Sequence, residues 1–192
     1  IDLARFARAG ARGVGVDLAH GATRLAATYL RQIEASPART TFDAEIVEAD
    51  GAALPFPDAS FDFVFAHGVI QYASDDRAIV NEVRRVLKPG GQAVFQVYNR
   101  LSWLNALSKL MKVGLEHEDA PVLRKYSRGE FRRLLAGFTE VRIVPERFPV
   151  KSRLHGGWKG TLYNGLFVGT FNALPRALVA RFGWHLLAFC RN

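Results

Sequence analysis

Two aspartates stand where they could hold a nucleoside. Asp17 ends one short apolar run, and Asp50 follows another. A carboxylate such as that of Asp17 can accept two hydrogen bonds from ribose hydroxyl groups, and Leu18 beside it could cover an adenine face. The turn at Gly51 and Ala52 could receive the adenine, with the Asp50 carboxylate accepting from the amino group and a backbone N–H donating to a ring nitrogen. Because an aspartate after a strand is often a helix cap, neither residue is decisive alone.

The sequence leaves the catalytic residue unknown. His67 could accept a proton, but a histidine in this position can equally serve packing or positioning. Tyr72 and Tyr98 are alternatives, and each can instead be a core or rim aromatic. None of the three is assigned a role.

Metal chemistry is not expected. Cys190 is the single cysteine, which excludes a disulfide framework and a multi-cysteine metal site and is most consistent with a reducing, cytoplasmic setting. The run 116–119 holds potential ligands, but adjacent residues do not converge on one ion without a tight loop. We therefore expect a solvated turn there.

Alternating strands and helices must position these residues. Apolar runs predict strands at 13–17, 44–49, 61–66, 93–98, 141–144 and 184–190, and helical spacing predicts helices at 1–9, 21–34, 75–87, 101–111 and 127–135. Such alternation implies right-handed crossovers and an α/β fold with a mostly parallel sheet covered on both faces. Ligands bind beyond the carboxyl ends of such strands. The residues found there are Asp17, Asp50, His67 and Asn99.

Charge is uneven along the 192 residues. The composition, 49% hydrophobic and 23% charged, excludes a disordered chain and fits one domain. The net charge is +8, and residues 120–192 hold 13 basic and 3 acidic side chains, so the whole excess lies in the last third. This can mark an anionic substrate, a nucleic acid or an anionic membrane surface, and a solvated basic face explains it equally well. The longest uncharged stretch, 160–175, is interrupted by polar residues and predicts no transmembrane segment.

Three segments in fixed order resemble a known family, the class I S-adenosylmethionine-dependent methyltransferases. They are Gly13-Val14-Gly15-Val16-Asp17, the run EADGAALPFPDASFD at 48–62, and Leu87-Lys88-Pro89-Gly90-Gly91. The nearest subgroup includes the ubiquinone- and menaquinone-type C-methyltransferases. The resemblance covers about residues 1–100 and is carried by the ordered combination, which is much more specific than any one segment.

The resemblance implies S-adenosylmethionine as the cofactor and a role for each matching residue. Asp17 would hold the ribose, Asp50 the adenine, and His67-Gly68 would lie near the methionine moiety. The implied cofactor-binding residues are Asp17, Leu18, Asp50, Gly51, Ala52, His67 and Gly68. The implied fold is a Rossmann-like three-layer sandwich with seven strands in the order 3-2-1-4-5-7-6, the last antiparallel. The run 184–190 would be that last strand, beside 93–98.

One part of the family pattern has no counterpart in this sequence. The first strand and its glycine-rich loop are absent, because Ile1 falls where the following helix should begin. That strand would lie centrally, between the strands that end at Asp17 and Ala66, and its loss would cost far more than the ~5–15 kcal/mol stability of a domain. We therefore expect this sequence to be a fragment that binds cofactor poorly.

The resulting hypothesis is a single methyltransferase domain over residues 1–192, with 1–100 as its cofactor-binding part. The variable segments 101–126 and 148–183 would cap the substrate, and their leucine and phenylalanine content favours a small, lipophilic or aromatic methyl acceptor. Aligning the acceptor with the activated methyl group needs no dedicated residue. The helically spaced stripe 167–182 favours a cap on the sheet over a membrane-binding face.

Three rivals remain, and the oligomeric state is unknown. An RNA methyltransferase would explain the basic last third, although no aromatic-basic stacking motif is visible. A nicotinamide-dependent dehydrogenase shares the acid after a strand but does not explain the turn at Asp50 together with Lys88-Pro89-Gly90-Gly91. A non-catalytic binding protein on a degraded methyltransferase scaffold is the third.

Overall fold

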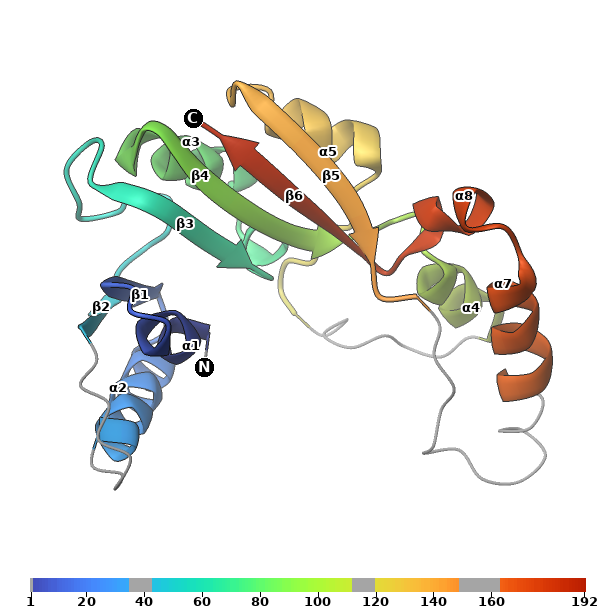
Figure 1. Ribbon diagram of the computed structural model, residues 1–192, viewed down its shortest axis with the longest axis horizontal. Coiled ribbons are helices and arrows are strands. Elements are labelled where there is room, and N and C mark those ends of the chain that lie inside the picture. Colours follow the sequence, from blue (N-terminus) through green and yellow to red (C-terminus); the bar gives the residue numbers. More distant parts are fainter. Residues whose placement is uncertain (1, 35–42, 112–119, 149–162) are drawn as a thin grey trace. The chain divides into compact units, whose positions relative to one another are not determined.

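The computed structural model describes residues 2–34, 43–111, 120–148 and 163–192 (Figure 1). The chain divides into two compact units, Ile1–Pro57 and Asp58–Asn192. In the described ranges, no helix is both long and apolar enough to cross a membrane. The assignment of the whole chain to a single domain stays a prediction.

The first unit is a two-stranded parallel sheet with two helices. Its elements are α1 (Asp2–Arg8), β1 (Gly13–Asp17), α2 (His20–Glu34) and β2 (Ala44–Glu48). The strands pair in register from Gly13 opposite Ala44 to Asp17 opposite Glu48. All four elements lie within two residues of their predicted bounds at each end.

Two glycines let β1 lie close to its neighbours. A Cβ atom on Gly13 would lie 2.6 Å from a methyl carbon of Leu3, and one on Gly15 would lie 2.9 Å from a methyl carbon of Ile46. These separations are shorter than carbon atoms tolerate, so a side chain at either position would force the Leu3 or Ile46 side chain to shift. The glycines of this motif therefore serve packing.

The second unit is a four-stranded sheet in the order β3-β4-β6-β5. Its strands are β3 (Phe61–His67), β4 (Leu87–Tyr98), β5 (Glu140–Glu146) and β6 (His185–Arg191). β3 and β4 are parallel, whereas β6 runs antiparallel to both β4 and β5. In the numbering of the implied fold, β3, β4, β6 and β5 are strands 4, 5, 7 and 6, and strand 7 (β6) is the antiparallel one. β1 and β2 are strands 2 and 3 of that fold. The predicted order is confirmed within each unit.

Helices and turns complete the second unit. They are η1 (Ile70–Tyr72), α3 (Asp76–Val86), α4 (Trp103–Met111), α5 (Arg128–Leu134), a π-helical turn (Tyr163–Val168), α7 (Gly169–Ala173), α8 (Arg176–Val179) and η3 (Ala180–Phe182). The Asp75 side chain caps α3 by accepting from Ala78 N at 2.9 Å. A capping box starts α5, in which Ser127 and Glu130 each accept from the other's backbone N–H. Polar caps therefore fix where both helices begin.

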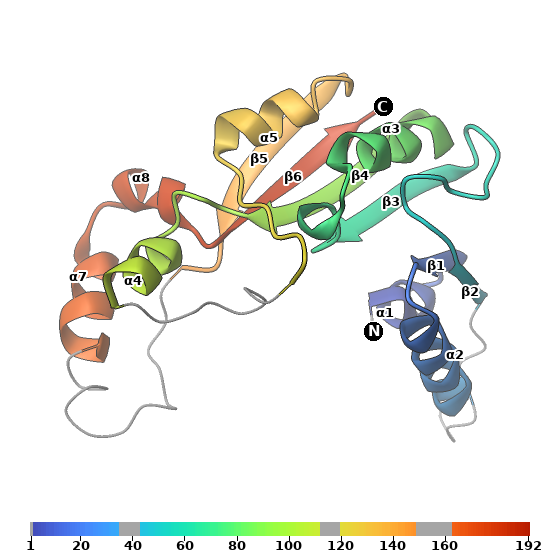
Figure 2. The same cartoon turned by 180° about the vertical axis from the view of Figure 1, so that it is seen from behind.

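α3 and α5 cover one face of the four-stranded sheet (Figures 1 and 2). Alternate strand residues are buried beneath them, namely Ala93, Phe95, Val97, Ile143, Leu186, Ala188 and Cys190. The helices add Ile79, Val80, Val83 and Phe131. Burial of each large apolar side chain contributes roughly 1.5–3 kcal/mol, so this layer holds the unit together.

The segment after α3 departs from its predicted boundary. The helix ends at Val86 as the proline requires, but β4 begins at Leu87 rather than at residue 93. Leu87 pairs with Phe61 and Gln92 pairs with Phe63, so residues 88–91 bulge out of the ladder. Gly90 takes a positive φ of 77° at this bulge, which a residue with a side chain rarely adopts. The end of the helix before the proline is confirmed, whereas residues 88–91 form an irregularity within β4 rather than a turn that precedes the strand.

Candidate functional site

Asp17 and Asp50 lie at the same edge of the first unit's sheet. Asp17 is the last residue of β1, and Asp50 follows β2 by two residues. Asp17 Oδ1 accepts a hydrogen bond from Ala19 N at 2.8 Å, and Asp50 Oδ1 accepts from Ala52 N at 2.9 Å. These short local turns fix how each carboxylate points, and both side chains are exposed. The edge therefore presents two oriented anionic acceptors.

The other predicted residues of this unit flank the two carboxylates. The Leu18 side chain is 68% exposed directly after Asp17. Gly51 and Ala52 form the turn after Asp50, which Ala53 N closes onto Asp50 O at 3.0 Å. The five predicted residues of this unit thus gather at the carboxyl ends of two adjacent strands.

Sequence reasoning missed a histidine-carboxylate pair at this edge. His20 Nδ1 lies 2.6 Å from Glu48 Oε2, which joins the start of α2 to the end of β2. Glu48 is also the residue opposite Asp17 in the ladder. In the sequence, the only signal for Glu48 was its position at the end of an apolar run. Its pairing with His20 spans 28 residues, so no local pattern reveals it.

His67 and Gly68 belong to the second unit, at the end of β3. His67 is the last residue of that strand, opposite Gln96, rather than the first residue beyond it. Its exposed ring stacks on Phe65, with centroids 5.5 Å apart and planes 16° from parallel. Gly68 has a φ of 74° and donates its N–H to Gln96 O at 3.3 Å, so the chain turns sharply away from the sheet here.

The structure brings the two tyrosines of the sequence prediction together. The hydroxyl groups of Tyr72 and Tyr98 are 3.0 Å apart, and Tyr98 packs on Trp184 with ring centroids 4.7 Å apart. The neighbouring side chain of Gln71 is buried, and its Oε1 has no hydrogen-bond partner among the described residues. A buried acceptor of this kind is uncommon, so η1 places an unsatisfied polar atom directly before Tyr72 in the chain.

His185, which sequence reasoning missed, completes that cluster. Its ring lies 5.4 Å from that of Tyr98 and 6.5 Å from that of His67, and its side chain is buried. Burial, followed by the charges of Arg147 and His67, lowers the pKa of His185 to about 4. The imidazole is therefore neutral at neutral pH.

Other acidic and amide residues singled out by the sequence have structural partners. Asp58 pairs with Arg85 at 2.7 Å, which joins the loop before β3 to the end of α3, and Asp62 on β3 pairs with Lys88 on β4 at 2.8 Å. Lys88 lowers the pKa of the Asp62 carboxyl below its usual range, first by hydrogen bonding. The Asn99 amide nitrogen donates to the carbonyl of Gly183 at 2.8 Å and holds the end of β4 to the start of β6.

The variable segments are described only in part. Residues 112–119 and 149–162 lie outside the described residues, and with them the run 116–119. The stripe expected between 167 and 182 is divided between the π-helical turn, α7, α8 and η3. Leu174 and Leu178 are exposed on these pieces. In the described part of the chain, no three His, Cys, Asp or Glu side chains gather as metal ligands.

Comparison with known proteins shows which family the chain resembles. Residues 2–95 match the family described as "Methyltransferase domain". The ubiquinone biosynthesis O-methyltransferase of Sodalis glossinidius is 33% identical over 126 residues, which are 65% of this chain and 45% of that protein. Over residues 2–95, just under half of its length, the chain is similar to the S-adenosylmethionine-dependent methyltransferases. The cofactor of this family is S-adenosylmethionine.

Two further comparisons show what the chain resembles. The malonyl-[acyl-carrier protein] O-methyltransferase of Erwinia pyrifoliae is 30% identical over 123 residues, covering 60% of this chain and 46% of that protein. A crystal structure from Thermotoga maritima, described as a possible histamine N-methyltransferase, covers 98% of this chain and 77% of its own at 21% identity, with a TM-score of 0.59. That likeness shows the Rossmann-like fold. The chain spans less than half the length of the two curated relatives.

Proposed function

We propose that the chain catalyses S-adenosylmethionine-dependent methyl transfer to a small, lipophilic or aromatic acceptor. One observation carries the proposal: Asp17 and Asp50 lie, oriented and exposed, at the carboxyl ends of adjacent parallel strands. Both belong to the segment that matches the methyltransferase family. Ligands of parallel sheets bind at this edge.

The residues of the first unit fit a nucleoside. Asp17 would accept from the two ribose hydroxyl groups, and Asp50 from the adenine amino group. The Ala52 N–H is already bonded to Asp50 Oδ1. We therefore propose that the Gly51 N–H donates the hydrogen bond to the adenine ring nitrogen. The exposed side chain of Leu18 would cover one face of the ring. In the second unit, His67 and Gly68 would lie near the methionine moiety.

When bound, S-adenosylmethionine supplies an activated methyl group. The chain's own part is to orient the acceptor and to exclude water from it. The paired hydroxyl groups of Tyr72 and Tyr98 can orient an acceptor oxygen or nitrogen, and the exposed His67 imidazole can take the proton that the acceptor loses. His185 is neutral and buried, and it supports the Tyr98 ring rather than meeting the acceptor.

Exposed apolar side chains in the variable segments support a lipophilic acceptor. Leu101, Phe148 and Leu178 are all exposed in the described parts of these segments. Two relatives are named for malonyl-[acyl-carrier protein] methylation and for ubiquinone biosynthesis. A cytoplasmic location belongs to the same proposal, because Cys190 is the only cysteine.

The test is transfer of a radiolabelled methyl group from S-adenosylmethionine to a panel of acceptors. The panel contrasts a phenol and a quinol bearing alkyl tails with their tail-free counterparts, and the control is Asp17→Asn. We expect label in the tailed acceptors and about tenfold less with the control variant. Label that enters only the polar acceptors would contradict the acceptor class. Label that is equal in the two proteins would contradict the role of Asp17.

A further inference from the structure

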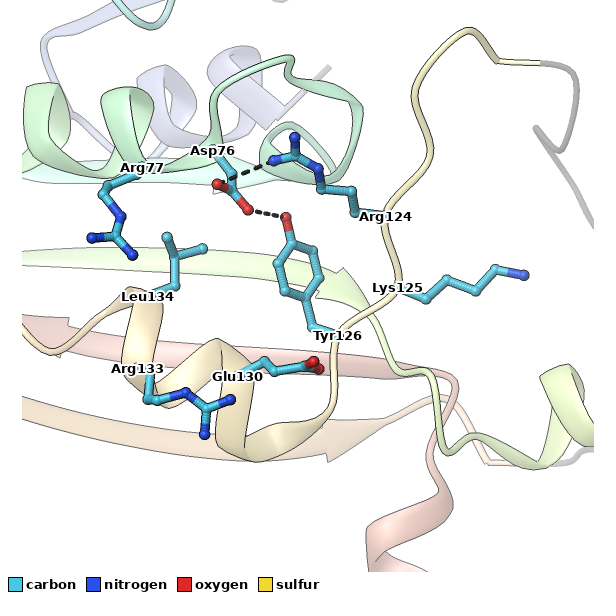
Figure 3. Close-up of a pocket in the computed structure, with 8 residues that line it drawn as sticks. All are labelled: Asp76, Arg77, Arg124, Lys125, Tyr126, Glu130, Arg133 and Leu134. Carbon is cyan, nitrogen blue, oxygen red and sulfur yellow. Dashed lines mark hydrogen bonds and ion pairs between the residues drawn. The ribbon is translucent and has the colours of Figure 1, made fainter.

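One unassigned feature of the second unit is a basic hollow between α3 and α5. Its volume is about 390 Å³, within the range of small-molecule sites. Its walls come from the first turn of α3, the segment 124–126 and α5 (Figure 3). Four cationic side chains and two carboxylates line it, and none of the proposed cofactor residues does.

Both carboxylates of this hollow are already paired. Asp76 Oδ1 lies 3.1 Å from an Arg124 guanidinium nitrogen, and Asp76 Oδ2 accepts from the Tyr126 hydroxyl at 2.7 Å. Burial and then Asp76 raise the pKa of Tyr126 above its usual range, so that hydroxyl stays a donor. Glu130 Oε2 accepts from Ser127 N at 2.8 Å and is also paired with Arg100. The acids therefore leave little charge to balance the remaining cations.

Arg77 and Arg133 are those remaining cations. They reach from α3 and α5 to either side of Leu134, whereas Lys125 extends away and donates to Asn105 Oδ1 at 3.0 Å (Figure 3). Among the described residues, neither Arg77 nor Arg133 has a carboxylate within ion-pair distance. Two guanidinium groups near one apolar side chain, Leu134, suit an oxyanion attached to an organic group, since a guanidinium can donate two parallel hydrogen bonds to an oxyanion.

We propose that this hollow binds the phosphoryl group of a small phosphorylated molecule through Arg77 and Arg133. S-adenosylmethionine carries no phosphate, so the ligand is not the cofactor. The segment that forms one wall also pairs with the strand ends: Tyr126 N donates to Tyr98 O at 2.9 Å, and Arg124 N donates to Gln71 O at 2.9 Å. A bound phosphoryl group would therefore hold the segment that braces the Tyr72–Tyr98 pair.

The experiment is a titration of the purified chain with pyrophosphate at constant ionic strength, followed by ³¹P NMR. Arg77→Gln and Arg133→Gln should each weaken binding about tenfold. The matched control is Arg132→Gln, on the same helix but bonded to Val141 O outside the hollow, and it should leave binding unchanged within about twofold. In the unmodified chain, the Leu134 methyl resonances should shift with the same titration, which tests the site without any substitution.

Several results would overturn the proposal. They are pyrophosphate binding no stronger than that of chloride, an Arg132→Gln effect equal to the other two, or Leu134 resonances that do not move. Tighter binding of a single-stranded RNA, steeply dependent on salt and equally sensitive to all three arginines, would assign the face to nucleic acid instead. S-adenosylhomocysteine binding should be the same in Arg77→Gln and in the unmodified chain. Its loss would assign the hollow to the cofactor carboxylate and leave the proposed function standing.

Discussion

The strand ends of the two units present different kinds of side chain. In the first unit, the edge presents exposed carboxylates, with Asp17 and Asp50 each set by a short turn. In the second, the strand ends gather a mostly buried aromatic cluster around Tyr98 and His185. Exposed anionic acceptors suit the hydroxyl and amino groups of a nucleoside, whereas a buried aromatic cluster suits an apolar acceptor. The proposed function accordingly assigns the nucleoside of the cofactor to the first unit, and the acceptor and the methionine moiety to the second.

The largest expected effect tests whether the second unit depends on its own core. Phe95 is fully buried beneath α3 and α5, so Phe95→Ala should lower the free energy of unfolding by about 3–5 kcal/mol. All three tryptophans, Trp103, Trp158 and Trp184, lie in this unit, so fluorescence during denaturation reports on it. The control Leu101→Ala removes a side chain that is 60% exposed and should cost less than about 1 kcal/mol. Equal losses for the two variants would contradict this account of the core.

The second prediction concerns His185 and pH. Its pKa of about 4 in the folded chain lies below the unfolded value of about 6.5, so the unfolded state binds the proton first as the pH falls. Its contribution is therefore complete above about pH 6.5 and is lost as the pH falls toward about 4, by up to about 3 kcal/mol.

The measurement is tryptophan fluorescence during denaturation at several pH values, for the unmodified chain and for His185→Gln. The difference between their unfolding free energies should shrink between about pH 6.5 and 4. His67→Gln, which changes an exposed imidazole, should keep most of the pH dependence of the unmodified chain. A constant difference between the unmodified chain and His185→Gln would show that His185 is not held neutral by burial.

The smallest expected effect concerns the wall of the basic hollow. Ser127→Ala removes one half of the capping box at the start of α5 and should lower the unfolding free energy of the second unit by about 1 kcal/mol. Ser127→Thr keeps the capping oxygen and should retain most of the stability. If both variants lose the same amount, the side-chain oxygen is not what stabilises this helix start.

Much of the fold was predictable because its signals are local. Apolar runs located the six strands, and the proline in 88–91 located the end of α3. The order of the strands came from the resemblance rather than from the runs themselves. The early start of β4 was not predictable, since whether residues 88–91 end the ladder or bulge from it depends on pairing with Phe61 and Phe63.

The candidate site was predictable only where one strand end sufficed. Asp17 and Asp50 could be found because each follows its own apolar run. The pairing of His20 with Glu48 and the contact of Tyr98 with His185 join residues far apart in sequence, and no local pattern marks them. The role of Gly13 and Gly15 in packing against Leu3 and Ile46 likewise needs the three-dimensional arrangement.

The most direct test of the central claim is an amide chemical-shift titration of the chain with S-adenosylhomocysteine. We predict weak but saturable shifts at residues 17–19 and 50–53, with about tenfold weaker binding still in Asp17→Asn and in Asp50→Asn. The matched control is Asp43→Asn, an exposed acid before β2 that should leave the binding curve unchanged. Saturable shifts confined to other residues, or curves unaffected by Asp17→Asn and Asp50→Asn, would contradict the assignment of this edge to the cofactor.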